Sequence, residues 1–151
     1  MHVDCALICD YVTVREGLLH VLGGGVSRIW RTAYPGPLGA GLALRIVVHP
    51  SEFDADHKIA VLLNDDDGHK LAEIGSDFHI TPEMRRGIEP GEEFAVNMPL
   101  NLPMIAIPRV GDYVFDILID GQHQRSVPFK AKAGPAPSLP FPRTPDTQAG
   151  D

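Results

Sequence analysis

The stretch that most constrains the fold is residues 111–129, with the sequence GDYVFDILIDGQHQRSVPF. Every second residue from Tyr113 to Ile119 is a large apolar one, and Asp116 and Asp120 fall between them. This period of two is typical of a β-strand. Asp120 and Gly121 then supply turn chemistry, because a tight hairpin needs residues that tolerate positive φ. The stretch therefore predicts a β-hairpin.

The register of this hairpin follows from keeping one of its faces apolar. A plain two-residue loop would place Phe115 opposite Ser126 and interrupt the apolar face. A loop of odd length instead places Val127 and Phe129 on the same face as Phe115 and Tyr113. Because a slip of one residue inverts the faces of a strand, we expect an odd-length loop with a bulge.

Short strand patterns separated by turn residues run along most of the chain. Val3–Cys9 is almost entirely apolar, which suits a central strand covered on both faces. Lys70–Phe78 breaks strict alternation, and Gly75 suggests a bulge there. A single helical turn is expected around Glu83–Arg86, between Pro82 and a glycine. About eight or nine short strands without an amphipathic helix predict an all-β protein, a single antiparallel β-sandwich of immunoglobulin-like or jelly-roll-like architecture.

The composition divides the chain into a domain and a tail. Residues 1–132 are long enough to bury a core as one domain. Residues 133–151 contain five prolines and few large apolar side chains, so a disordered Pro-rich tail is predicted. Pro137–Pro140 and Pro142–Pro145 have the spacing of extended proline ligands, but so many prolines in a short tail produce that spacing by chance.

Charge and hydropathy exclude several classes of function. The formal net charge of −7 opposes binding to nucleic acid or to an anionic membrane surface, because both need clustered Lys and Arg. No apolar run approaches the roughly 20 residues that a spanning helix needs. The first residues, MHVDCALIC, lack the pattern of a secretory signal, so a cytoplasmic location is expected.

Two small motifs near the amino terminus could carry chemistry but have simpler explanations. Cys5 and Cys9 would lie about 13 Å apart on one strand face, which is too far for a disulfide, so they are expected to be reduced. The run Gly23–Gly25 could cradle a phosphate, but no GK[ST] follows it. A bulge or tight bend is the plainer interpretation.

One constellation of polar residues could hold a metal ion. If the strands 40–48, 57–63 and 70–78 run as up-down-up neighbours, one pole of the sandwich gathers five imidazole and carboxylate side chains. These residues are His49, Asp54, Asp56, His57 and His79. They offer the donor set of zinc, manganese or iron sites. The run Asp65–Asp67 with His69 would lie at the other pole, roughly 20 Å away, and is read as a turn.

Two functional hypotheses stay open. The sequence has no nucleophile motif such as GxSxG and no HExxH, and we expect no cofactor. The first hypothesis is a non-enzymatic binding or protein-interaction module. Trp30 and Tyr34, beside a Pro/Gly-rich loop, form its candidate interaction surface. It would bind a protein partner or form a homo-oligomer. The alternative is a metal-binding protein or metal-dependent hydrolase that uses the His/Asp pole.

Three parts of the sequence resemble those of a known family: the opening VDCALICDYVTVREGLLHVLGGGVSRIW, the segment MPLNLP, and GDYVFDILIDG followed by VPF. The family that they resemble consists of small, uncharacterised bacterial proteins that are common in actinobacteria. This resemblance covers most of the chain up to about Lys132 and is weakest between Pro50 and Gly91. It implies a compact β-rich cytoplasmic domain of unknown function. It implies no catalytic residue.

Overall fold

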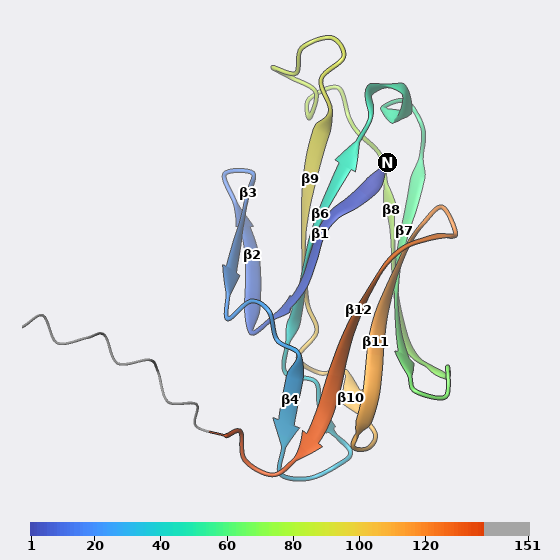
Figure 1. Cartoon of the computed structure of the whole chain (residues 1–151). Helices are drawn as coiled ribbons and strands as arrows, with labels where there is room; N and C mark the ends of the chain where they lie inside the picture. Colours follow the sequence, from blue (N-terminus) through green and yellow to red (C-terminus); the bar gives the residue numbers. More distant parts are fainter. Residues whose placement is uncertain (138–151) are drawn as a thin grey trace, which may run out of the picture.

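The computed structural model describes residues 1–137, which form two facing β-sheets and a separate hairpin layer (Figure 1). Residues 138–151 of the tail predicted at 133–151, which include Pro140, Pro142 and Pro145, lie outside the described residues. The elements in chain order are β1 (His2–Cys9), β2 (Tyr11–Arg15), β3 (Leu18–Leu22), β4 (Arg28–Arg31), β5 (Gly36–Pro37), β6 (Gly41–Val48), the 3₁₀ helix η1 (Pro50–Glu52), β7 (His57–Asp65), β8 (Lys70–Phe78), β9 (Phe94–Asn101), β10 (Ala106–Ile107), β11 (Gly111–Ile119) and β12 (Gln122–Ala133).

The two large sheets confirm the predicted all-β class. One sheet has five strands in the order β4-β12-β11-β7-β8, and the other has three in the order β1-β6-β9. Within these sheets every pair is antiparallel except β4 with β12. Residues 1–137 contain twelve strands, more than the eight or nine expected, partly because β5 and β10 have only two residues each.

A tyrosine corner fixes the start of β11. The hydroxyl of Tyr113 donates a hydrogen bond to the carbonyl of Arg109 at 2.8 Å, an arrangement that recurs in immunoglobulin-like sandwiches. The ring of Tyr113 stacks on Phe129 at a centroid distance of 5.5 Å, and Phe115 stacks on the same ring at 5.6 Å. Of the two predicted architectures, this corner favours the immunoglobulin-like one.

The β11–β12 hairpin has the predicted pairing and the predicted bulge, but its loop differs from the expected one. Tyr113 lies opposite Phe129 and Phe115 opposite Val127, as the apolar face requires. The connection itself is a two-residue turn at Asp120-Gly121, with φ of 52° and 77°, so the expected odd-length loop is wrong. The register shift comes from a bulge inside β12, where Gln124 has no partner on β11.

Strand β6 is the central strand of the smaller sheet and is buried on both faces. Leu42 and Leu44 enter the core between the sheets, while Ala43 faces outward and is equally inaccessible. The β2–β3 hairpin covers this outer face, where Val12 packs against Ala43 and Cys9. Figure 1 shows the hairpin as a third layer beside the β1-β6-β9 sheet.

Two local predictions differ from the structure, and a third is confirmed. Val3–Cys9 is an edge strand rather than a central one, because among residues 1–137 β1 pairs only with β6. The helical turn expected around Glu83–Arg86 is present as hydrogen-bonded turns, in which the Arg85 nitrogen donates to the Thr81 carbonyl at 3.3 Å, and η1 is the only assigned helix within residues 1–137. None of the helical structure in this part of the chain has the length and apolar character to cross a membrane. The irregularity in β8 lies at the register shift opposite Leu63 and Asn64, not at Gly75.

Two asparagines of β9 hold the hairpin layer in place. Asn101 bonds both backbone groups of Val12: its Oδ1 accepts from the Val12 nitrogen at 3.1 Å, and its Nδ2 donates to the Val12 oxygen at 2.7 Å. Asn97 donates from Nδ2 to the carbonyl of Gly17 at 2.7 Å. Since Val12 is fully buried, its backbone groups have no access to water as an alternative partner.

We expect Asn101→Ala to loosen the hairpin layer. The change leaves a buried N–H and a buried C=O unpaired, which destabilises by about 1–3 kcal/mol. Chemical unfolding measures the total loss, and amide hydrogen exchange at Val12, whose N–H is bonded to Asn101, locates it. The matched control is Asn97→Ala, which removes one bond at the exposed end of the hairpin and is expected to have a smaller effect. Equal losses in the two variants would contradict this assignment.

Candidate functional site

The end of β6, the start of β7 and the end of β8 lie at one end of the sandwich (Figure 1), and the five residues of the predicted metal pole are at or next to these strand ends. His49 follows β6, Asp54 and Asp56 precede β7, His57 opens β7, and His79 follows β8. The assumed strand order is wrong, because β6 and β7 belong to different sheets. The chain crosses between the sheets through η1 at this end, so the strand ends still meet there.

His57 is held by two hydrogen bonds inside the protein. Its side chain is 8% exposed, with Nδ1 at 2.7 Å from Asp120 Oδ2 and Nε2 at 3.1 Å from the Glu52 carbonyl. Burial alone would lower the pKa of His57, but the bonds to the Asp120 carboxylate and the Glu52 carbonyl outweigh burial and raise it. Two acceptors facing the ring suit the doubly protonated imidazolium.

Asp120 completes this contact from the β11–β12 turn. Its Oδ1 accepts from the backbone nitrogen of Lys58 at 2.8 Å, and its own nitrogen donates to the Lys58 carbonyl at 2.8 Å. The pKa of Asp120 is lowered, first by the hydrogen bond from His57 and then by the bond from Lys58. The pair therefore links the start of β7 to the end of β11.

The other residues of the pole form separate contacts. His79 Nδ1 lies 3.0 Å from Asp56 Oδ1, Asp54 pairs with Arg85 at 2.7 Å, and His49 Nδ1 lies 2.9 Å from the Ser51 hydroxyl. A cleft of about 470 Å³ brings part of the pole together. Its lining residues are Asp56, His57, Lys58, Asp77, Phe78, His79 and Asp120. Metal binding at this pole stays a prediction.

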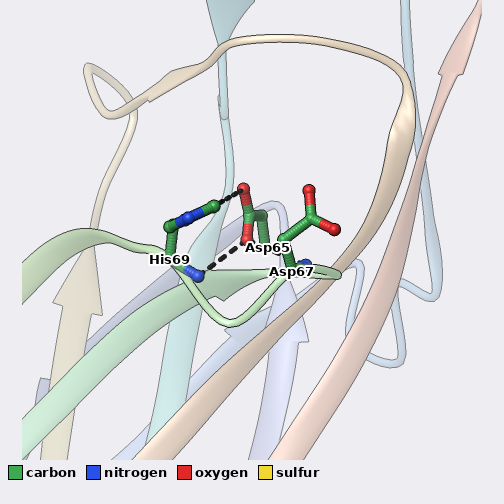
Figure 2. Close-up of side chains that lie close together, drawn as sticks. All are labelled: Asp65, Asp67 and His69. Carbon is green, nitrogen blue, oxygen red and sulfur yellow. Dashed lines mark hydrogen bonds and ion pairs between the residues drawn. The ribbon is translucent and has the colours of Figure 1, made fainter.

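A tighter group of possible metal ligands lies at the opposite end, in the β7–β8 turn. Within residues 1–137, it is the one group of three His, Cys, Asp or Glu side chains whose ligand atoms lie within 4.8 Å of one another. It consists of Asp65, Asp67 and His69 (Figure 2). Asp65 Oδ1 accepts from the backbone nitrogens of Asp67 at 3.0 Å and His69 at 2.8 Å. These bonds, the one from His69 first, lower the pKa of Asp65.

A protein cation already offsets part of the negative charge of this turn. Arg109 Nη2 lies 2.8 Å from Asp66, 3.0 Å from Asp67 and 3.8 Å from Asp65. Asp65 is an Asx-type turn residue, with its side chain 8% exposed and both its oxygens turned toward groups of the protein. The arrangement agrees with the predicted turn.

The structure also assembles a polar cluster that sequence reasoning missed. On the outer face of the β11–β12 hairpin, His123 Nε2 lies 2.8 Å from the Ser126 hydroxyl and 3.3 Å from Asp116 Oδ1, and the Ser126 hydroxyl donates to the same oxygen at 2.5 Å. Asn64 donates to the other oxygen of Asp116. One imidazole nitrogen thus faces both serine and aspartate, whereas a nucleophilic relay needs the two nitrogens to face one partner each.

The predicted aromatic surface is partly tied into the domain. The hydroxyl of Tyr34 donates to the Lys132 carbonyl at 2.9 Å, and its ring packs against the main core. Trp30 is half-buried in β4. Arg31 holds the following loop by donating to the carbonyls of Trp30 at 2.6 Å, Pro37 at 2.7 Å and Leu38. A recognition role for Trp30 and Tyr34 stays a prediction.

The β2–β3 hairpin exposes a group of large apolar side chains on its outer face. Tyr11 is 53% exposed, Leu18 63% and Leu22 67%. Tyr11 lies directly opposite Leu22, and Leu18 lies opposite Arg15, so all of them share the face turned away from the sandwich. Which face of this hairpin points outward depends on the sheet beneath it, so it cannot be read from the hairpin's own sequence.

These observations define a three-layer, all-β sandwich domain with an exposed hairpin. The chain matches the model of the Family of unknown function (DUF6941) over residues 4–132, and it belongs to that family. A search of curated proteins finds no match.

Several solved structures have a weak similarity to this chain. The alkylpurine DNA glycosylase AlkC of Pseudomonas fluorescens, bound to DNA containing an abasic site analog, has 12% identity and a TM-score of 0.37 over 85% of this chain and 30% of that chain. A β-glucuronidase of glycoside hydrolase family 2 has 12% identity and a TM-score of 0.31 over 62% and 10%. A putative β-galactosidase from Bacteroides fragilis has 12% identity and a TM-score of 0.29 over 82% and 15%. The chain therefore spans a third or less of these proteins, and likenesses at such TM-scores are no basis for inferring a function.

We expect the contribution of His57 to stability to fall as pH rises. Its pKa is raised in the folded state, so its stabilisation is fully present below the ordinary histidine pKa of about 6.5 and is lost as pH increases through the folded-state value. Against the His57→Gln variant, the wild-type free energy of unfolding should be greater by about 1.5–3 kcal/mol near pH 5.5, and the difference should shrink by pH 9.

The control for this measurement is His79→Gln, which changes an imidazole whose ring is half exposed. Its stability difference from wild type is expected to stay small across the same range. A difference for His57→Gln that grew between pH 5.5 and 9 would show that the ring is held in its neutral form.

Proposed function

We propose that this protein is a non-enzymatic interaction module that binds a protein partner through the outer face of the β2–β3 hairpin. The observation that carries the proposal is the exposure of Tyr11, Leu18 and Leu22 together on that face. Full burial of one such side chain contributes about 1.5–3 kcal/mol, so a folded chain gains from covering them.

The hairpin has the mechanical properties of a binding platform. Its inner face is fixed to the sandwich by Val12, and its backbone is bonded to Asn101 and Asn97 of β9. The outer face is therefore presented in one orientation without a loss of conformational freedom on binding, which favours affinity. The large tyrosine and leucine side chains project on either side of the smaller Thr13, so they could insert into pockets on a partner surface.

The polar clusters support a binding role over catalysis. Both nitrogens of His57 contact acceptors within the protein, so neither is available as a base or a ligand without breaking a bond. At the Ser126 cluster, a single imidazole nitrogen faces both serine and aspartate. A nucleophile activated by a base needs that base to be oriented by a third group through its second nitrogen.

We expect the Leu18→Asp, Leu22→Asp double variant to lose partner binding by at least ten-fold while remaining folded. The two charges oppose burial of the face, but both positions are exposed, so stability should change by less than about 0.5 kcal/mol each. Tagged wild-type and variant proteins are compared for the proteins they retain from cell extract, and affinities of those proteins are then measured with purified components.

The matched control is Met104→Asp, at a methionine that is 86% exposed but lies in the β9–β10 connection. It adds one negative charge, against two in the double variant, at a remote apolar position and should leave binding unchanged. A partner lost equally from both variants, or retained by both, would refute the proposed role of the hairpin.

The alternative, a metal-binding protein or metal-dependent hydrolase, is favoured by one observation: two imidazole–carboxylate pairs face the 470 Å³ cleft. In this alternative the more exposed pair, His79 and Asp56, binds the ion first, because its members are 48% and 93% exposed. Imidazole with carboxylate would select zinc or manganese over calcium.

Under this alternative, thermal unfolding after chelation should respond to one transition metal. Zn²⁺ or Mn²⁺ at 100 times its dissociation constant would stabilise the fold by about 2.7 kcal/mol, which is a shift of a few degrees in Tm. The shift should vanish in His79→Gln with Asp56→Asn and persist in His69→Gln, at the other end of the molecule. No shift with either metal or with Ca²⁺ would exclude the metal-dependent function.

A further inference from the structure

The edge strands of the two main sheets carry devices that discourage pairing with another chain, but β3 does not. Bulges, prolines and charges are such devices. In the smaller sheet, β1 has a bulge between Val3 and Cys5, and β9 contains Pro99. In the larger sheet, β8 has a register shift and exposes Glu73 and Asp77, and the four-residue β4 has an arginine at each end. By contrast β3 has the sequence LLHVL, without proline, bulge or fixed charge, and among residues 1–137 it pairs only with β2.

The backbone groups along the outer edge of β3 can be assigned from the clamp on β2. Val12 bonds Asn101 with both its N–H and its C=O, so these groups point away from β3. Its partner in the hairpin is Val21, which must therefore direct its own N–H and C=O away from β2. Leu19, two residues earlier on the same strand, does the same. The outer edge thus presents two donors and two acceptors.

The sequence of β3 is self-complementary about its central residue. Antiparallel pairing of two copies with His20 opposite His20 places Leu18 opposite Leu22 and Leu19 opposite Val21. In this register Leu19 and Val21 form the hydrogen-bonded pairs, which is what the outward direction of their backbone groups requires. The Glu16-Gly17 turn of one copy would approach Gly23 and Gly24 of the other, where no side chain obstructs it.

We propose that two copies of this chain pair through β3, in this register, to form a continuous four-stranded outer layer. This inference rests on the proposed function, because it makes the hairpin face a larger platform. A single hairpin of five-residue strands presents a face of only about 17 Å by 10 Å. A stable partner interface needs about 800 Å² from each side. Pairing doubles the apolar face and brings Leu22 of one copy beside Leu18 of the other.

A cysteine-pairing experiment tests the register directly. His20→Cys, in a Cys5→Ser background, places the new cysteine on the two-fold axis, where facing Cα atoms are about 4.5 Å apart, within the range of a disulfide. Leu18→Cys, on the same strand and the same face, is the matched control, because its own copy would lie about 13 Å away. We expect the disulfide-linked dimer to form at least ten-fold faster with His20→Cys than with Leu18→Cys in a glutathione redox buffer.

A second pair of variants guards against an effect of His20→Cys on folding. Leu18→Cys and Leu22→Cys, each poorly cross-linked alone, should cross-link readily when the two proteins are mixed. Equal rates for His20→Cys and Leu18→Cys, or no cross-link in the mixture, would overturn the β3 dimer. If partner binding were nevertheless lost in Leu18→Asp, Leu22→Asp, the hairpin would still be the binding face of a monomer, and the proposed function would stand without this inference.

Discussion

The double-sided burial of β6 is the constraint on which the rest of the structure depends. Leu42, Leu44 and Ile46 of this strand face the core, and Ala43 on its other face is equally inaccessible. A strand that is apolar on both faces must be covered by two layers. The five-stranded sheet covers one side, and the β2–β3 hairpin covers the other. The hairpin's position, its clamp by Asn101 and the exposure of its own outer face all follow from this requirement.

Local patterns in the sequence were sufficient for the strands but not for their order. The pairing of Tyr113 with Phe129 could be derived because both residues belong to one hairpin and only one register keeps an apolar face. The place of Val3–Cys9 could not, since an apolar run suits both a central strand and an edge strand that another layer covers. Cys9 is fully buried although β1 is an edge, because the hairpin lies over it. The sequence of one strand does not reveal such a cover.

In the candidate sites too, the end of the molecule at which a strand begins or finishes could be predicted, whereas contacts that depend on strand pairing could not. Sequence reasoning brought His57 and His79 to one end of the molecule, since the ends of neighbouring strands can be sorted from chain direction alone. It missed Asp120, the partner that determines the chemistry of His57, because the two lie 63 positions apart and meet only through the β7–β11 pairing. His123 and Ser126 are close in sequence, yet their contact depends on the bulge at Gln124, which shifts the facing of β12.

The run Gly23–Gly25 shows how a motif with two interpretations is resolved by packing. After β3 the chain must turn beneath the hairpin and reach β4 on the other sheet. A Cβ atom at Gly23 would lie 2.6 Å from Asp10 Cγ, and one at Gly24 would lie 2.7 Å from Leu7 Cδ1, so a larger residue at either position would force the Asp10 or Leu7 side chain to move. Gly23 and Gly25 also adopt φ of 62° and 89°, where glycine is favoured. The glycines therefore seat the hairpin against the sheet, and the same close seating is what turns Tyr11, Leu18 and Leu22 outward as a fixed apolar face.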